Sequence, residues 1–230
     1  MRFSPPVVLL VLGGPLRAWA PSTLYANLDF MWPGSPARIR VCWENPSPRA
    51  IGTTGATEDS ARAWVRQAVE ANWGRVARVD FSGWTTCAHH APGVHIRITT
   101  TGAGRAPGGS RLNGVDNGAS LDLYFNDRLN DCQSNVLNLR RCVVSQALHE
   151  FGHVLGFYHE EERPDYAGGS APGCARQSYP NPRPRYFGDY DISSVMSYCG
   201  QPSGQISTWK MELSAGDIAA VRSAYGARGM

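Results

Sequence analysis

The sequence predicts an α+β fold, with a twisted mixed β-sheet and helices in an N-terminal part and a smaller, irregular C-terminal part that ends in a helix. Strand-like and helix-like patterns of apolar residues alternate along the first two thirds of the chain. Pro, Gly and Ser are then dense from Arg163 to Gly188, which predicts an irregular excursion before a last helical pattern. The 230 residues suffice for one compact unit, or for two small ones that share a cleft.

Four segments have the alternation of a strand with one buried face. The first shows it clearly, with Ile39, Val41 and Trp43 on one side and polar residues between them. The predicted strands are 37–43, 76–81, 94–99 and 120–126. The Gly- and Asn-rich residues 101–119 are expected to form a loop, with an irregular edge strand as the alternative.

Three segments carry apolar residues at helical spacing. The predicted helices are 59–76, 141–155 and 213–225. Thr57 or Asp59 can cap the first helix, and Ser214 can cap the last, with Asp217 in its first turn. This order of strands and helices favours a sheet with helices on one face.

The first twenty residues have the layout of a secretory signal peptide. A positive start at Arg2 precedes the apolar run Val7–Leu12, and Ala18-Trp19-Ala20 supplies a small-x-small ending. The alternative is an ordinary buried N-terminal strand. We therefore expect a signal peptide at 1–20 and a soluble protein that is secreted, extracellular or periplasmic. No later run reaches the ~20 apolar residues of a membrane span.

Export changes the interpretation of the cysteines, which are Cys42, Cys87, Cys132, Cys142, Cys174 and Cys199. An even number in an oxidising compartment predicts three disulfides, for which about 15 pairings exist. A local bridge from Cys132 to Cys142 is favoured. A bridge from Cys174 to Cys199 would tie down the irregular loop and leave the first two cysteines to each other.

The charge balance argues against nucleic acid as a partner. The chain has 22 basic and 19 acidic residues and a net charge of +3, too balanced for electrostatic binding of nucleic acid. Removing residues 1–20 takes away Arg2 and Arg17 and leaves a charge of +1. Lys210 is the single lysine, which we interpret as biased codon usage. We expect a monomer.

Residues 149–160, HEFGHVLGFYHE, carry the chemistry. His149 and His153 are four residues apart and share one helix face, so both imidazoles can bind one ion. Glu150 can take a proton from a water on that ion. Gly156 suits a left-handed cap that brings His159 round as a third ligand. Three imidazoles leave a position open for water, as in a catalytic Zn²⁺ site.

These residues resemble the metzincin clan of zinc endopeptidases, and most closely the astacin family. The pattern HExxHxxGxxH is matched in full, and Glu160 with Arg163-Pro164-Asp165 looks like the astacin continuation. Residues 190–198, YDISSVMSY, resemble the astacin Met-turn, YDxxSVMHY. The resemblance covers about residues 37–226 and implies a metzincin-like zincin: a catalytic domain at 37–230, with subdomains 37–159 and 160–230 on either side of a zinc cleft.

The resemblance also implies roles for single residues. It makes Glu150 the general base, and Met196 the floor beneath the zinc ligands His149, His153 and His159. Tyr198 would be a distant fifth zinc ligand at rest that swings to hydrogen-bond the tetrahedral intermediate. Glu160 would reach a buried N-terminal amine. Ser197 replaces the family's usual His and leaves the spacing of Met196 and Tyr198 intact.

Other candidates have weaker signals. Residues 21–36 form a Pro-punctuated arm or short pro-segment, whose Asp29 is a zinc-blocking carboxylate in one interpretation and a solvated residue in the other. We expect Glu161 and Glu162 to be a solvated charge run. His89, His90 and His95 lack a partner at ligand spacing and are expected on the surface or in the sheet. Asn113, Asp116 and Asn117 are interpreted as a turn cluster rather than a calcium site.

The sequence thus favours a secreted zinc endopeptidase that acts on extended protein or peptide substrates. A catalytically silent metal- or peptide-binding module on the same scaffold is one alternative, although such modules tend to lose the base that Glu150 retains. A zinc amidase or esterase with a non-protein substrate is the other.

Overall fold

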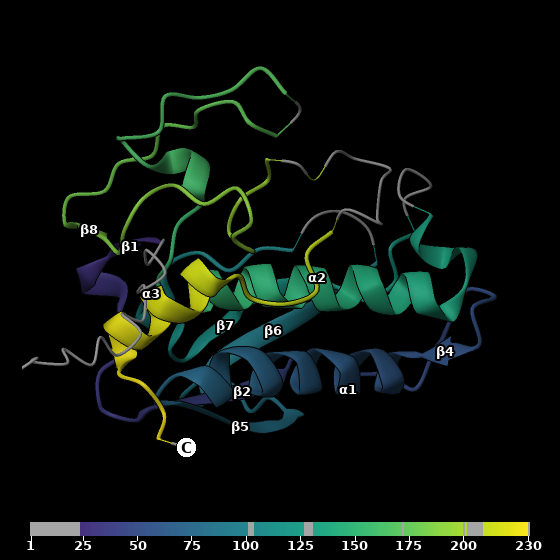
Figure 1. Cartoon of the computed structure of the whole chain (residues 1–230). Coiled ribbons are helices and arrows are strands. Elements are labelled where there is room, and N and C mark those ends of the chain that lie inside the picture. The colour runs from purple at the N-terminus through teal and green to yellow at the C-terminus, as the bar shows by residue number, and fades with distance from the viewer. Residues whose placement is uncertain are drawn as a thin grey trace, which may run out of the picture.

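A computed structural model of the chain describes residues 24–100, 104–126, 131–171, 173–199, 201 and 209–229. The expected signal peptide at 1–20 lies outside these residues. Figure 1 shows the sheet and the two long helices in the lower half of the molecule, with the irregular chain above them and the last helix at the left.

The central sheet has four parallel strands in the order β5-β2-β6-β7. Their bounds are Ala37–Trp43 for β2, Val79–Thr86 for β5, Val94–Thr99 for β6 and Val115–Asp122 for β7. Beside β7, Arg105 pairs with Ser120 in an antiparallel bridge, which makes the sheet mixed. The predicted alternation of β2 is confirmed, because Ile39, Val41 and Trp43 are buried while Arg38 and Arg40 are exposed.

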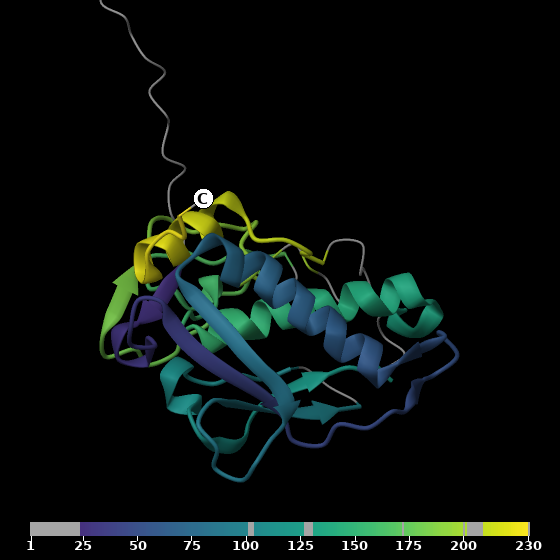
Figure 2. The same cartoon turned by 90° about the horizontal axis from the view of Figure 1, so that it is seen from below.

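Two helices cover one face of the sheet. They are α1 (Glu58–Val69), continued by a π-helical turn at Glu70–Gly74, and α2 (Val136–Val154). Figure 2 shows them side by side on the same face. The Trp73 indole N–H donates to the Leu148 carbonyl at 3.0 Å and joins them. Phe81 of β5 packs edge-on against Phe151 of α2, so the helix that carries the HExxH residues rests directly on the sheet.

Several predicted boundaries are wrong by a few residues. The strand predicted at 120–126 begins at Val115, where polar residues and glycine hid it, and ends at Asp122. It ends there because the Asp122 carboxylate accepts hydrogen bonds from the backbone N–H groups of Tyr124 and Phe125, both at 2.8 Å, and turns the chain. The strand predicted at 76–81 runs from 79 to 86, and the helix predicted at 141–155 begins at 136.

The predicted caps are confirmed. Thr57 and Ser60 form a capping box at the start of α1. Ser214 and Asp217 form another at the start of α3 (Ala215–Tyr225). The remaining elements are short: strands β3 (Ala50–Ile51) and β4 (Ala56–Thr57) pair with each other, and 3₁₀ turns lie at Leu28–Phe30, Gly109–Leu112, Cys132–Ser134 and Glu160–Glu162.

The expected N-terminal arm is part of the folded core from residue 24 onwards. Its strand β1 (Tyr25–Asn27) pairs antiparallel with β8 (Pro184–Tyr186). Leu24 and Ala26 are fully buried, and the Trp32 indole N–H donates to the Val154 carbonyl at 2.7 Å. Apolar burial and backbone pairing therefore fix this segment against the end of α2, although it lacks a periodic pattern.

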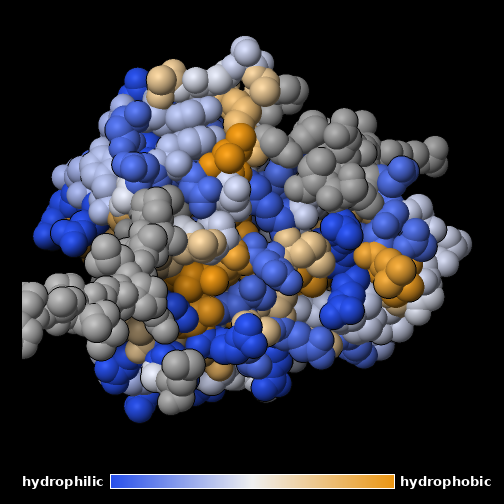
Figure 3. Space-filling view, in the orientation of Figure 1, coloured by the Kyte–Doolittle hydropathy of each residue, from blue (hydrophilic) through white to orange (hydrophobic). Residues whose placement is uncertain are grey.

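The three favoured disulfides are confirmed, as Cys42–Cys87, Cys132–Cys142 and Cys174–Cys199. Because disulfides persist in oxidising environments, they favour an extracellular protein. Among the described residues, no helix is long and apolar enough to cross a bilayer. On the face seen in Figure 3, hydrophobic residues form small separate patches in a largely hydrophilic surface.

Candidate active site

The three predicted ligand histidines meet at one point. His149 and His153 lie near the C-terminal end of α2, and Gly156, in the left-handed region at φ 92°, turns the chain so that His159 comes back towards them. The Nε2 atom of His159 is 3.1 Å from Nε2 of His149 and 3.0 Å from Nε2 of His153. Nitrogens on one tetrahedral zinc ion are about 3.3 Å apart, so this spacing fits such an ion.

The other nitrogen of each ring fixes its tautomer. Nδ1 of His149 donates to the Val195 carbonyl at 2.8 Å, and Nδ1 of His153 donates to the Phe157 carbonyl at 2.7 Å. Nδ1 of His159 is 3.0 Å from the Glu162 carboxylate. With the proton on Nδ1, each Nε2 points a lone pair at the others, an arrangement that a cation relieves. The donor set therefore fits zinc.

Burial keeps His149 and His153 neutral. It lowers the pKa of His153 to about 3 and that of His149 well below its usual value, because an imidazolium ion is poorly solvated there and the neighbouring histidines disfavour a second charge. Neutral imidazole is the form that binds a metal.

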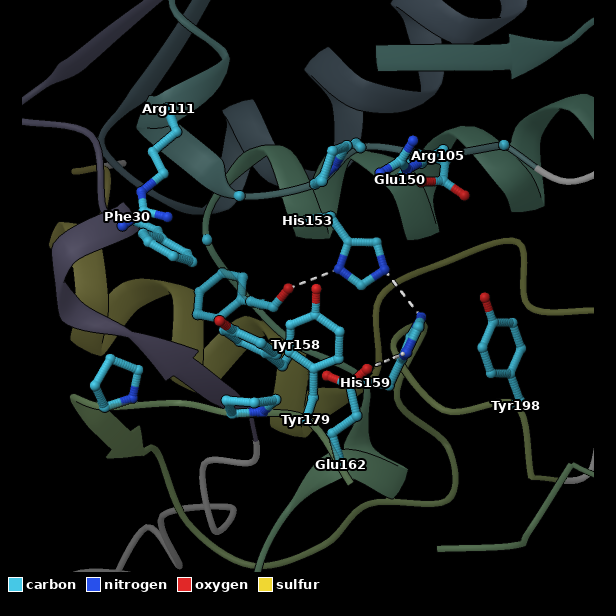
Figure 4. Close-up of a pocket in the computed structure, with 18 residues that line it drawn as sticks. Phe30, Arg105, Arg111, Glu150, His153, Tyr158, His159, Glu162, Tyr179 and Tyr198 are labelled. Carbon is cyan, nitrogen blue, oxygen red and sulfur yellow. Dashed lines mark hydrogen bonds and ion pairs between the residues drawn. The ribbon is translucent and has the colours of Figure 1, made fainter. Parts of the chain in front are cut away.

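Glu150 lies one residue after the first histidine and faces the cleft. Its side chain is buried, and burial raises its pKa to about 8. The backbone N–H of Ala106 donates a hydrogen bond to the carboxylate, which lowers the pKa and partly offsets the effect of burial. A Cβ on Gly104 would come within 2.7 Å of its Oε1, so the edge segment 104–106 lies directly against this carboxylate. Figure 4 shows Glu150, His153 and Tyr198 around the same opening.

Met196 and Tyr198 also lie at the histidines. Gly152 faces the Met196 sulfur so closely that a Cβ there would overlap it, so the thioether packs against the helix between the first two histidines. The Tyr198 ring centroid is 4.8 Å from that of His149 and 4.6 Å from that of His159, and 38% of its surface is exposed. Burial raises the pKa of its phenol, which stays protonated and able to donate.

Two charged residues that the sequence did not single out as functional hold the Met196 turn in place. The buried Asp217 carboxylate accepts from Ser194 Oγ at 2.6 Å and from the Val195 N–H at 2.9 Å. Lys210 Nζ donates to the carbonyls of Ser194 and Ser197, at 2.7 and 2.8 Å. Because the Val195 carbonyl also accepts the hydrogen bond from His149 Nδ1, these contacts position a candidate zinc ligand. In the sequence, only the capping position of Asp217 and the fact that Lys210 is the single lysine could have pointed to these two residues.

The expectation that Glu161 and Glu162 are a solvated charge run is wrong. Glu161 is fully buried and accepts from Ser197 Oγ at 2.6 Å and from the Cys199 N–H at 3.1 Å. The Glu162 carboxylate contacts Nδ1 of His159, three residues before it in the sequence. A run of like charges predicts an exposed segment, and the sequence does not reveal the burial of Glu161 because its partners lie far along the chain.

Two further predicted residues have other partners here. Asp29 pairs with Arg183 Nη1 at 2.6 Å and not with the imidazoles, so the zinc-blocking interpretation gains no support from its contacts. Glu160 is fully buried, accepts from the Asp191 N–H at 3.0 Å and lies 3.7 Å from Arg163. Burial raises its pKa to about 8.

The site opens into a cleft of about 600 Å³. One wall is the edge segment 104–108 with Glu150, and the other carries Tyr179, Pro180 and Tyr198. Arg111 lies over the Phe30 ring at 4.1 Å towards one end. The cleft is therefore bounded by the segment 104–108 and lined by aromatic and charged side chains.

Known proteins share this sequence and fold in part. No protein-family model matches the chain. A 54-residue stretch, 22% of the chain, is 43% identical to the zinc metalloproteinase nas-3 of Caenorhabditis elegans, and spans 18% of that protein. Two structures of myroilysin match the fold. The first has a TM-score of 0.59 and 18% sequence identity, and the match covers 90% of this chain and 100% of the myroilysin chain. The second has a TM-score of 0.53 and 17% identity, and the match covers 85% of this chain and 86% of the myroilysin chain. The chain thus spans under a fifth of its curated relative's length, and the structural likeness shows the fold. Together, the motifs, the homologous stretch and the fold show that this chain resembles the astacin family of metzincin zinc proteases.

Proposed function

We propose that this protein is an exported zinc endopeptidase that hydrolyses peptide bonds in extended polypeptides. The observation that carries the proposal is the convergence of three imidazole Nε2 atoms beside the buried carboxylate of Glu150, with that of His159 3.1 and 3.0 Å from the other two. A zinc ion held by His149, His153 and His159 would acidify a water and polarise the scissile carbonyl.

The protein's own groups then handle the protons. Glu150 accepts the proton of the attacking water and passes it to the leaving amine, a task suited to a buried carboxylate that lies beside the three histidines without being a proposed ligand. The Tyr198 phenol donates a hydrogen bond to the oxygen that becomes negative in the tetrahedral intermediate. Met196 supports the histidines from below.

The edge of the sheet supplies the substrate-binding surface. Arg105 pairs with Ser120 on its inner side, and the segment 104–108 lines the cleft along its outer side. We propose that an extended peptide adds to this edge as an antiparallel strand. The proposal includes a signal peptide at 1–20 and a catalytic domain at 37–230, in which 37–159 and 160–230 face each other across the cleft.

Chelation tests the proposed function. We expect the purified protein to degrade unfolded casein, and a zinc chelator to reduce this to background, because the ion supplies the water's acidity. Adding zinc back should restore the rate. Zinc-dependent cleavage of ester or non-peptide amide substrates, with casein intact, would favour the amidase or esterase instead; zinc binding with no hydrolysis would favour the silent module.

Tyr198→Phe removes the proposed oxyanion donor. We expect kcat to fall about 10²- to 10³-fold with little change in KM, since the hydrogen bond forms only in the transition state. Steady-state kinetics on a quenched fluorescent peptide measure both constants. Tyr179→Phe, which removes another phenol in the same cleft, should leave kcat nearly unchanged. A rise in KM alone for Tyr198→Phe would contradict this role.

A further inference from the structure

A second group of potential metal ligands lies outside the cleft. His89 and His90, in the loop between β5 and β6, meet Asp116 at the start of β7, and Glu44 and His95 lie behind them. We call these five residues the Asp116 cluster. Along the sequence the histidines have no partner at ligand spacing, but the fold brings one to them from 26 residues away. The cluster lines no part of the cleft.

The outer part of the cluster converges on one oxygen atom. Nδ1 of His89 contacts Oδ2 of Asp116, and Nδ1 of His90 is 3.1 Å from the same oxygen. The two imidazole rings lie 3.8 Å apart between centroids, inclined by 31°. Both side chains are exposed, 80% for His89 and 68% for His90, so water molecules can reach this point and complete the coordination of an ion. Two imidazole nitrogens and a carboxylate oxygen thus lie within 4.8 Å of one another.

The inner part of the cluster holds Asp116 and supplies negative charge. His95 is fully buried, and its Nε2 donates to the Ala91 carbonyl at 2.6 Å. Its Nδ1 then faces Glu44 Oε1 at 2.8 Å and Asp116 Oδ1 at 3.1 Å. Whether or not that nitrogen carries a proton, the two carboxylates leave the trio with a net negative charge. The trio therefore presents an oriented anionic oxygen to His89 and His90.

The backbone on both sides is held in an uncommon conformation. His90 and Asn117 have φ angles of 54° and 53°, in the left-handed region that residues other than glycine seldom adopt. The His90 N–H donates to Asp116 Oδ1 at 2.8 Å, and the Asn117 N–H donates to Glu44 Oε1 at 3.0 Å. Such strain persists where its surroundings fix it and is concentrated at ligand sites.

We propose that the Asp116 cluster binds a divalent transition-metal ion through Nδ1 of His89, Nδ1 of His90 and Oδ2 of Asp116. Two imidazoles with one carboxylate suit zinc and its neighbours in the transition series, whereas calcium requires oxygen ligands. Glu44 and His95 are positioning residues that orient Asp116, as carboxylates and histidines do behind metal ligands. The ion joins the β5–β6 loop to β7 and is independent of the proposed peptidase activity.

Zinc stoichiometry tests the proposal. After chelation and equilibrium dialysis against near-stoichiometric Zn²⁺, we expect wild-type protein to hold two equivalents by metal analysis. The double variant H89A/H90A should hold one, and both positions are exposed enough for the fold to survive. A matched control, D80N, changes a partly exposed carboxylate elsewhere on β5 and should keep two. D116N should also hold one.

A second measurement separates this site from the catalytic one. In H153A/H159A, which lacks two proposed ligands of the cleft, one equivalent should remain, and zinc should raise the Tm. Adding H89A/H90A should abolish both effects. The proposal would be overturned by a single wild-type equivalent that H89A/H90A keeps and H153A/H159A loses, or by two equivalents in H89A/H90A. A zinc-induced Tm shift that survives in the quadruple variant would also overturn it.

Discussion

Glu150→Gln is expected to lower the rate of peptide hydrolysis by about 10²- to 10⁴-fold while the zinc content stays the same. Glutamine has the size of glutamate and accepts the Ala106 N–H equally well, but it cannot take the proton of the attacking water. The side chain lies beside the histidines without being one of the proposed ligands. Hydrolysis of a fluorescent peptide and metal analysis of the same sample measure the two quantities.

Glu70→Gln provides the matched control. This substitution makes the same chemical change on the surface of the first helix, where Glu70 pairs with Arg66, so it should leave the rate unchanged. Activity that persists in Glu150→Gln would eliminate this carboxylate as the base. Loss of activity together with loss of zinc would instead assign it a role in holding the metal.

Gly152→Ala is expected to lower the free energy of unfolding by about 1–3 kcal/mol, because overpacking forces side chains and backbone to shift. The new Cβ would overlap the Met196 sulfur, which lies against the helix between His149 and His153. The displacement should also weaken zinc binding. Urea unfolding monitored by circular dichroism gives the free energy, and zinc titration gives the affinity.

Gly74→Ala and a double variant make this prediction specific. Gly74 is also helical, but its Cβ would meet its neighbours at 3.7 Å, an ordinary contact, so alanine there should cost little. Met196→Ala in the Gly152→Ala background should remove the overlap, so the two losses should be far from additive. Additive losses would show that the sulfur is not what excludes a side chain at Gly152.

The zinc-binding segment could be predicted because its chemistry is local. His149, His153 and His159 lie within eleven residues, and helix periodicity plus one glycine suffices to bring them together. The helix caps and the strand β2 were equally readable, since each depends on residues close in sequence. The disulfides could be ranked because one bridge is local and another closes a conspicuous loop.

The features that could not be predicted from the sequence depend on contacts between residues that are far apart along the chain. Glu161 looks like a surface charge until Ser197 and the Cys199 backbone come to it from across the fold. The N-terminal arm has no periodic pattern because only three residues of it form a strand, against a partner far along the chain. The Asp116 cluster is hidden for the same reason.

The pairing of β1 with β8 bears on the order in which this protein folds. Tyr25 faces Tyr186, so this contact spans most of the chain, and long-range contacts form late and slowly. The three histidines can gather as soon as α2 and the following turn exist. The cleft around them closes only after β8 has been made and has found β1. We therefore expect the complete cleft to form only after most of the chain has been made.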